Sequence, residues 1–323
     1  MGAVLAIEGL SVDFLTPRGR VHALREVSLQ VIPGRIVGIV GESGSGKSTL
    51  VLAALALLPG NAEVLAGRVV FGDADVLRLP PAALREVRGR RIAVVFQDPL
   101  TSLNPVLSIA TQMTDLQYRE RGRSRQDKRR RAIALLQRVG IADAASRIDD
   151  YPHQFSGGMR QRIAIAMALL AGPELLIADE PTTALDVTLE AQIIHLLREL
   201  RQELAGSILF VSHNLGLIAE LCDEVVVMYA GEVVEEGGIF DLFHRPGHPY
   251  TRALLECDPA SAEGAGRALA TIPGEVPDLI RPPRGCVFAP RCAHAFARCR
   301  EASPGWTALA GGHRARCHLL AGA

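Results

Sequence analysis

The chain has 323 residues, and its 35 Lys and Arg residues balance 35 Asp and Glu residues, so the formal net charge is zero. This balance gives no overall basic field of the kind that attracts nucleic acid. No apolar run reaches the ~18 residues that a membrane-spanning helix needs, and the N-terminal segment, with Glu8, lacks the pattern of a secretion signal.

The first half of the chain begins with predicted strands and continues with helices. The predicted strands are 4–14, 26–32, 36–40, 67–71 and 91–96. The first two alternate apolar and polar residues as antiparallel strands do, and Pro33-Gly34 forms a turn into the third, which is buried. From about 105 to 150 the pattern is helical and strongly charged. We interpret its most basic run, 119–131, as a solvated helix face rather than a binding patch.

The second half alternates helices and strands. The predicted elements are helix 158–171, strand 174–179, helix 187–204, strand 207–211, helix 214–222 and strand 224–229. This alternation indicates an α/β fold, a parallel sheet with helices on both faces. After Gly237 proline and glycine become frequent and the periodicity weakens, so we expect a domain boundary near residue 255.

A glycine-rich stretch, Gly41–Thr49, joins the apolar strand 36–40 to a predicted helix and fits G-x-x-x-x-G-K-[ST] at every specified position. Glycines allow successive N–H groups to point into one concavity, at the positive end of the helix dipole. Lys47 adds a point charge for the outer phosphates, and the Ser48 hydroxyl is placed to bind Mg²⁺. The stretch therefore predicts a site for a phosphate chain.

Two more stretches carry chemistry. Leu175–Glu180 is an apolar strand that ends in two carboxylates. Asp179 is placed to hold Mg²⁺ and Glu180 to polarise an attacking water, although such a pair often only caps a helix. Upstream, Phe155–Arg162 contains Ser-Gly-Gly at the start of a predicted helix, which is a second potential anion site.

Two phosphate-binding helix starts, separated by a helical insertion, resemble one family, the ATP-binding subunits of ABC transporters. The stretch Phe155–Arg162 is similar to that family's signature sequence. Gln97, at the end of a strand, resembles the glutamine of the Q-loop, and Ala184-Leu185-Asp186 resembles the D-loop. His213 resembles the switch histidine, and Phe14 stands where the family places an aromatic residue against adenine.

The resemblance implies four groups of site residues. They are the ATP contacts Phe14, Ser43, Gly44, Ser45, Gly46, Lys47, Ser48 and Thr49; the signature residues Ser156, Gly157, Gly158 and Met159, which would contact ATP of a facing subunit; the Mg²⁺ ligands Ser48, Gln97 and Asp179; and the catalytic residues Glu180, His213 and Gln97, with Asp186 in the D-loop. ATP would close two such domains head to tail, and hydrolysis would release them.

Several further stretches resemble the subfamily that serves dipeptide and oligopeptide permeases. They are Gln97–Pro105, Ala178–Thr188, His248–Leu255, Ile272–Pro277 and Pro282–Cys286. The resemblance implies import of peptides, with nickel, glutathione or oligosaccharides as alternative cargo. It also implies two transmembrane permease subunits, a second ABC ATPase (a different chain or an identical one), an extracytoplasmic binding protein, no nucleic acid, and a peripheral position on the cytoplasmic face of the bacterial inner membrane.

The C-terminal extension after residue 255, called the tail below, carries four cysteines with the spacing C-x₅-C-x₆-C-x₁₇-C. They are Cys286, Cys292, Cys299 and Cys317. Four thiolates can bind Zn²⁺ or a [4Fe–4S] cluster. The wide spacing in a Pro- and Gly-rich segment favours the cluster, and the resemblance implies the same, while zinc stays an alternative. Histidines of the tail, His294, His313 and His318, are expected to be exposed to solvent rather than to act as ligands, and Cys222 and Cys257 to be ordinary small residues.

These patterns predict two parts: an ABC-type P-loop domain over 1–255, with an antiparallel β subdomain and a helical subdomain at about 98–160, and a cysteine-containing extension over 256–323. Two other functions fit the sequence less well. A soluble ABC ATPase acting on DNA or ribosomes would favour coiled-coil insertions or tandem domains, which are absent from the sequence. A regulatory or inactive module would not keep Glu180, His213 and Ser156 intact.

Overall fold

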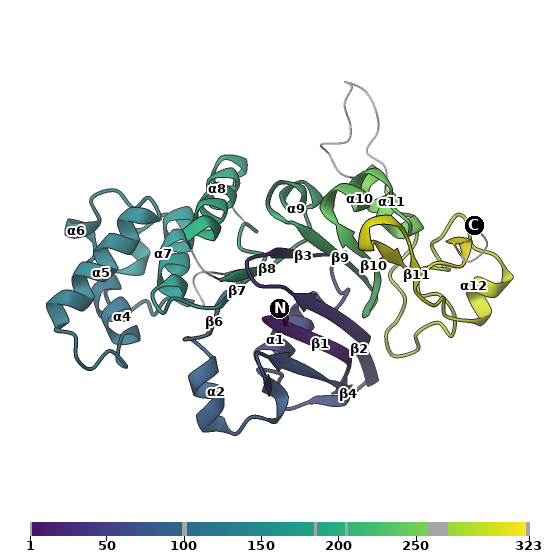
Figure 1. Cartoon of the computed structure of the whole chain (residues 1–323), viewed down its shortest axis with the longest axis horizontal. Helices are drawn as coiled ribbons and strands as arrows, with labels where there is room; N and C mark the ends of the chain where they lie inside the picture. Colours follow the sequence, from purple (N-terminus) through teal and green to yellow (C-terminus); the bar gives the residue numbers. More distant parts are fainter. Residues whose placement is uncertain (1, 99–101, 184–185, 204–205, 258–270, 321–323) are drawn as a thin grey trace. The chain divides into compact units, whose positions relative to one another are not determined.

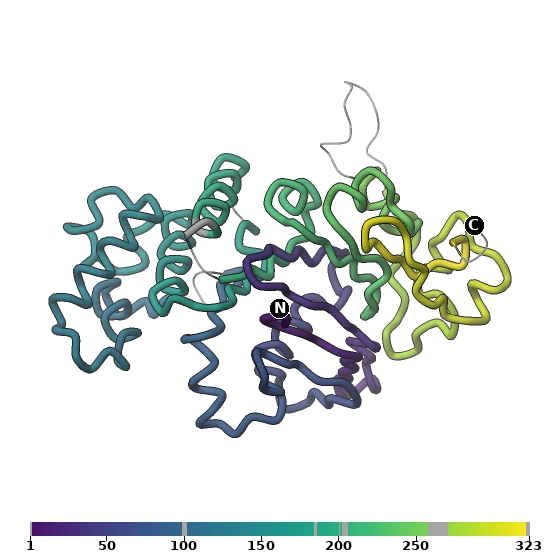
Figure 2. Tube along the Cα trace, viewed as in Figure 1, coloured from purple at the N-terminus to yellow at the C-terminus, as the bar shows by residue number. Residues whose placement is uncertain are grey.

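The computed structural model describes residues 2–98, 102–183, 186–203, 206–257 and 271–320, and it divides into two compact units. The first unit comprises Met1–Leu79 and Phe210–Ala323, and the second comprises Pro80–Leu209. Figures 1 and 2 show the path of the chain. Within the described ranges, no helix is both long and apolar enough to cross a membrane.

The first unit begins with an antiparallel sheet of strand order β2-β1-β4-β5 (Figure 1). Its strands are β1 (Leu5–Thr16), β2 (Gly19–Val31), β4 (Ala62–Phe71) and β5 (Ala74–Asp75). Leu5 lies opposite Val31 on one side and Phe71 on the other, and all three are buried. The predicted antiparallel pair is confirmed, but β2 and β4 begin several residues earlier than the sequence pattern indicated.

The same unit contains β3 (Ile36–Val40), which runs parallel to β9 (Glu224–Tyr229). β9 continues antiparallel to β10 (Glu232–Gly238), which pairs with a short tail strand, β12 (Arg314–Ala315). Every residue of β3 is buried, as the continuous apolar run indicated. The remaining elements are α1 (Lys47–Ala54), η1 (Val76–Arg78), α9 (Leu215–Leu221), α10 (Ile239–His244), α11 (Pro249–Glu256), α12 (Ala297–Glu301), β11 (Thr307–Ala308), η4 (Ala310–Gly312) and η5 (His318–Leu320).

The second unit combines two parallel strands with helices. Its elements are α2 (Pro81–Val87), β6 (Ile92–Val95), α4 (Ile109–Leu116), α5 (Arg125–Arg138), α6 (Ala144–Arg147), η2 (Pro152–Gln154), α7 (Gly157–Leu169), β7 (Leu175–Asp179) and α8 (Val187–Glu203). β8 (Ser207–Ser212) begins in this unit and ends in the first. Serine side chains cap three helix starts: Ser108, Ser124 and Ser156 accept N–H bonds at α4, α5 and α7.

The basic run 119–131 lies mainly on α5, and most of its arginines are ion-paired. Arg129 pairs with Asp149 at 2.6 Å, and Arg131 pairs with Glu120. α5 buries Ala132 and Leu136, while Arg125, Gln126 and Arg130 of the same helix are exposed. The run is therefore a charged, solvated face, as interpreted from the sequence.

A buried carboxylate, Glu235 of β10, holds the tail in place. Its side chain is fully buried and accepts N–H bonds from Gly247 at 2.5 Å and His248 at 2.9 Å. The third contact is to His313, whose Nε2 lies 2.6 Å from Glu235 Oε1. His313 is 2% exposed, so the expectation that it faces solvent was wrong: the ring has a buried partner 78 residues away. Of the other two tail histidines, His294 is exposed, as expected, and His318 is half-buried.

We expect Glu235→Ala to lower the free energy of unfolding by about 3–5 kcal/mol, because it leaves two N–H groups and a histidine without their buried partner. Denaturant unfolding of the variant and the wild type measures this change. Glu275→Ala removes an exposed carboxylate of the same tail, and it should change stability by no more than about 0.5 kcal/mol. Equal stability of the two variants would contradict the role assigned to Glu235.

Candidate functional site

The phosphate loop, Gly41–Thr49, connects β3 to α1 as predicted. At two positions of the loop, only glycine fits for steric reasons. A Cβ at Gly41 would lie 2.1 Å from the Met228 carbonyl oxygen, and a Cβ at Gly46 would lie 2.8 Å from that of Ala23. Gly46 also has a φ of +102°, which L side chains rarely adopt. The loop therefore packs its backbone against neighbouring backbone, and larger residues at these two positions would break the packing.

Lys47 is held over this loop by main-chain carbonyls. Its side chain is buried, and Nζ donates to the oxygens of Gly41 at 2.7 Å and Glu42 at 3.2 Å. Ser43, Gly44 and Ser48 are exposed around it. Ser45 is buried, and its Oγ makes no hydrogen bond to any residue that the structure describes. This arrangement places a cation and exposed loop atoms at the N-terminus of α1, which favours an anionic ligand.

The two carboxylates predicted for catalysis end β7. Asp179 is 8% exposed and is the last residue of the strand, and Glu180 follows it. Glu180 has a φ of +48°, in the left-handed region that a residue with a Cβ enters at a cost. Thr183 donates to Glu180 Oε2 at 3.0 Å, and its N–H donates to the Glu180 carbonyl. The local turn thus holds the Glu180 side chain against Thr183.

The signature residues begin α7 as predicted. Ser156 is exposed and caps the helix by accepting the Met159 N–H at 3.4 Å. Arg147, which the sequence did not single out, fixes this start: it lies 4.3 Å over the Phe155 ring, and it donates to the Gln154 carbonyl at 3.1 Å. Gly157 is half-buried and Gly158 is buried.

The remaining predicted residues lie at element ends or on strand faces. Gln97 is exposed after β6, and His213 is exposed directly after β8. Asp186 caps α8 by accepting the Leu189 N–H at 2.9 Å, while Ala184 and Leu185 lie outside the described residues. Phe14 is half-buried on β1, opposite Val21 and Ala62.

The predicted site residues fall into two sets. The phosphate loop, Phe14 and His213 belong to the first unit. Gln97, Asp179, Glu180, Asp186 and the signature residues belong to the second. Each set keeps the local geometry described above. Sequence reasoning missed Thr183 and Arg147. Thr183 follows the carboxylate pair closely and could have been found from that position, whereas no sequence pattern pointed to Arg147.

The four tail cysteines line one small cavity of the first unit, which we call the cysteine cavity; Cys286, Cys292, Cys299 and Cys317 share it with His248, His294 and His318 among others. Burial raises the pKa of the Cys286 thiol to about 11 and also raises those of Cys292 and Cys317. Among the described residues, no three His, Cys, Asp or Glu side chains lie close enough together to hold a metal ion. The structure thus gathers the predicted cysteines without arranging them as ligands of one ion, and neither a cluster nor zinc is shown.

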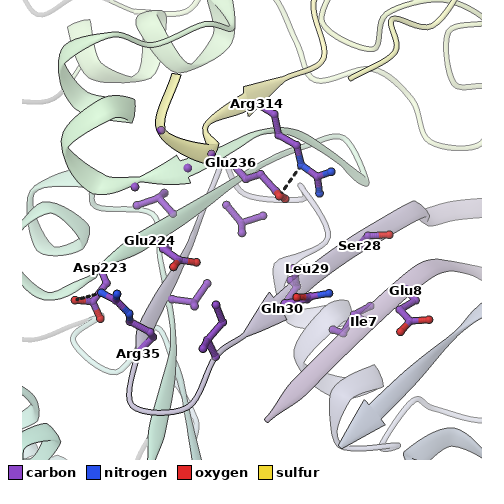
Figure 3. A pocket seen from close by; sticks show the side chains of 18 residues that line it. Ile7, Glu8, Ser28, Leu29, Gln30, Arg35, Asp223, Glu224, Glu236 and Arg314 are labelled. Carbon is purple, nitrogen blue, oxygen red and sulfur yellow. Dashed lines mark hydrogen bonds and ion pairs between the residues drawn. The ribbon is translucent and has the colours of Figure 1, made fainter. Parts of the chain in front are cut away.

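A different cavity of the first unit carries none of the predicted site residues (Figure 3). Its two arginines face carboxylates: Arg314 Nε lies 2.7 Å from Glu236, and Arg35 lies 3.7 Å from Asp223. Both guanidinium groups of this cavity therefore have carboxylate partners.

Comparison with known families gives two matches. Residues 24–183 match the family described as ABC transporter, and residues 234–299 match the family described as oligopeptide/dipeptide transporter, C-terminal region. The first match covers the phosphate loop, the signature residues and the β7 carboxylates. The second covers most of β10, all of α11 and the first three cysteines of the cavity.

Curated relatives align over nearly the whole chain. A putative peptide import ATP-binding protein of Brucella abortus is 48% identical over 97% of this chain and 94% of its own length. The dipeptide transport ATP-binding protein DppD of Escherichia coli is 46% identical over 98% and 96%. Among solved structures, the ATP-binding cassette MJ0796, in a dimeric post-hydrolysis state bound to ADP and phosphate, has a TM-score of 0.65 and 28% identity, covering 73% of this chain and 98% of its own.

We expect Glu180→Gln to keep ATP binding and to lower the ATP hydrolysis rate by a factor of about 100 or more, because an amide cannot act as a general base and a general base typically contributes at least that factor. Hydrolysis is measured as phosphate release, and binding as the Kd for Mg-ATP, in Glu180→Gln. Glu199→Gln, an exposed change on α8, is the matched control and should keep wild-type turnover. Retention of most ATPase activity in Glu180→Gln would overturn the assignment of the base.

Proposed function

The chain belongs to the ATP-binding proteins of ABC transporters, and from that membership we propose that it hydrolyses ATP to drive the import of dipeptides or oligopeptides through a membrane permease. Peptides are proposed as the cargo because residues 234–299 match the C-terminal region of oligopeptide/dipeptide transporters. Relatives named for peptide import and for dipeptide transport, aligned over 94% and 96% of their own length, support the same cargo.

The proposed chemistry assigns a role to each residue of the two sets. Lys47 and the phosphate-loop N–H groups bind the phosphates, while Phe14 stacks on the base. Ser48, Gln97 and Asp179 hold Mg²⁺, whose charge offsets that of the phosphates. The Glu180 carboxylate takes a proton from the attacking water, and His213 contacts the outer phosphate.

The proposed cycle needs a second ATP-binding subunit. Ser156 and Gly158 lie at the start of α7, where the exposed Ser156 and the helix N-terminus suit a phosphate presented by a facing subunit. ATP then favours the closed pair, and hydrolysis removes that preference. Asp186 lies at the start of α8, and as the D-loop residue it would respond to the contact with the facing subunit.

From the same family membership we also propose the other subunits of the transporter and its place at the membrane. Two permease subunits would span the membrane, an external binding protein would deliver the peptide, and this chain would sit on the cytoplasmic face of the inner membrane. We also propose that the chain divides into two parts. These are an ATPase domain over 1–255, with a helical subdomain at about 98–160, and an extension over 256–323.

The cysteine cavity suits a [4Fe–4S] cluster by the chemistry of its donors, since four thiol side chains from one short segment line it. Cys286, Cys292, Cys299 and Cys317 would hold the cluster, and when bound it would cross-link the tail. The chain itself already fixes two of these positions, because the Cys286 N–H donates to the Cys299 carbonyl at 2.8 Å. We propose a structural role for this group.

The transport proposal is tested by affinity purification of the chain from native membranes in mild detergent, followed by mass spectrometry. We expect two multispanning permeases, a second ATP-binding subunit, and a binding protein that carries peptide. A binding protein loaded with a nickel chelate or a sugar would contradict the peptide cargo. Recovery with ribosomes or nucleic acid and without a permease would contradict transport as a whole.

The cluster proposal predicts about four iron and four sulfide per chain after anaerobic purification. Cys299→Ser should lose this iron, because it removes one of the four donors. Cys257→Ser, a change in the same unit at a cysteine that does not line the cavity, should keep it. Zinc at one per chain without iron would contradict the cluster.

A further inference from the structure

Glu42, the second residue of the phosphate loop, is contacted by two side chains from the C-terminal part of the first unit. Arg291 donates to both carboxylate oxygens, from Nη1 at 2.7 Å and from Nη2 at 3.1 Å. The Tyr250 hydroxyl accepts the Glu42 N–H at 2.9 Å. These partners lie 249 and 208 residues away in the sequence, so the contacts join α11 and the tail directly to the phosphate loop.

Arg291 is itself fixed in position by the tail and by β9. Its Nε donates to the Pro273 carbonyl and Nη2 to the Ile272 carbonyl, both at 3.0 Å, while Nη1 lies 3.2 Å from the Tyr229 hydroxyl. Its side chain is 5% exposed. The pair with Glu42 is bidentate and joins two charged groups, which makes it stronger and more strictly oriented than a single neutral hydrogen bond. The side chain therefore acts as a rigid link rather than as a mobile surface charge.

Tyr250 is held as firmly. It is fully buried and packs against Tyr229, with ring centroids 4.5 Å apart, and against Phe288 at 5.3 Å. Phe288 precedes Arg291 by one turn, and its carbonyl accepts the Arg291 N–H at 3.0 Å. Cys292 of the cysteine cavity is the next residue. One short stretch of chain thus sets both the cavity wall and the position of Arg291.

Glu42 in turn holds the group that would bind phosphate. Its carbonyl oxygen accepts from Lys47 Nζ and from the Ser45 N–H, both at 3.2 Å. Its N–H, its carbonyl and its carboxylate are all engaged, so a shift of Glu42 moves an acceptor of Lys47. A Glu42 carboxylate without a partner would also place a negative charge in a loop built for an anion, where it would oppose binding.

We propose that Arg291 is a positioning residue for nucleotide binding: by pairing with Glu42 it sets the phosphate loop and neutralises that carboxylate, and so ties the affinity for ATP to the conformation of the C-terminal region. This inference rests on the proposed function, because it takes the phosphate loop to be the ATP site. Tyr250 acts with Arg291 by holding the Glu42 main chain.

The test measures the Kd for Mg-ATP on the full-length chain by calorimetry. Arg291→Met is expected to weaken binding about tenfold, equivalent to ~1.4 kcal/mol. Arg291→Lys keeps the charge without bidentate geometry and should weaken it less. Arg300→Met removes an exposed arginine of the same segment, beside Cys299, and should bind ATP as the wild type does.

The double variant Arg291→Met with Glu42→Gln separates positioning from general packing. Because the amide carries no charge to oppose the phosphates, it should bind ATP more tightly than Arg291→Met alone. Equal ATP affinity of wild type, Arg291→Met and Arg291→Lys would overturn the inference, as would a double variant that is weakened by the sum of the two single changes. Failure of the wild type to bind ATP would instead overturn the proposed function.

Discussion

The close approach of the chain at Gly41 to the Met228 carbonyl is the constraint on which the phosphate loop depends. It presses the end of β3 against the end of β9, and further main-chain bonds secure the same region. Gly231, in the turn after β9, donates to the Ser45 carbonyl at 3.0 Å, and its own carbonyl accepts from Arg25 at 2.8 Å. Contacts with β9, with Ala23 of β2 and with Gly231 therefore fix the shape of the loop, which lowers the entropy cost that binding must overcome.

The two sets of proposed site residues use different devices for the same purpose. In the first unit, the main-chain carbonyl oxygens of Gly41 and Glu42 hold the Lys47 ammonium in place. In the second, the backbone of Glu180 is kept in a left-handed conformation by the turn that Thr183 closes. Strain of this kind persists only where the surroundings enforce it, and it is common where a side chain must point in one direction. Both devices restrict a charged group to one orientation before the reaction begins.

Short-range patterns in the sequence predicted what depends on neighbouring residues. β3 and β9 have the predicted bounds, and the phosphate loop, the α7 start and the β7 carboxylates lie where their motifs indicated. Contacts across long stretches of chain were not predictable in this way. His313 lies buried against Glu235, and Arg147 secures Phe155, because pairing of distant polar groups leaves no periodicity to detect. The part of the chain after Gly237 has weak periodicity, and it is held by such polar contacts together with the packing of Phe288 against Tyr229 and Tyr250.

The three bonds of Glu235 also determine which pieces of this chain can be exchanged between relatives. Its partners are Gly247, His248 and His313, so β10, the start of α11 and the last turn before β12 share one buried carboxylate. A chimera joined between β10 and α11 would require two parents to agree on that acceptor and all its donors. A junction in the turn at Ala230–Gly231, ahead of β10, would move the carboxylate and its partners together as one inherited piece.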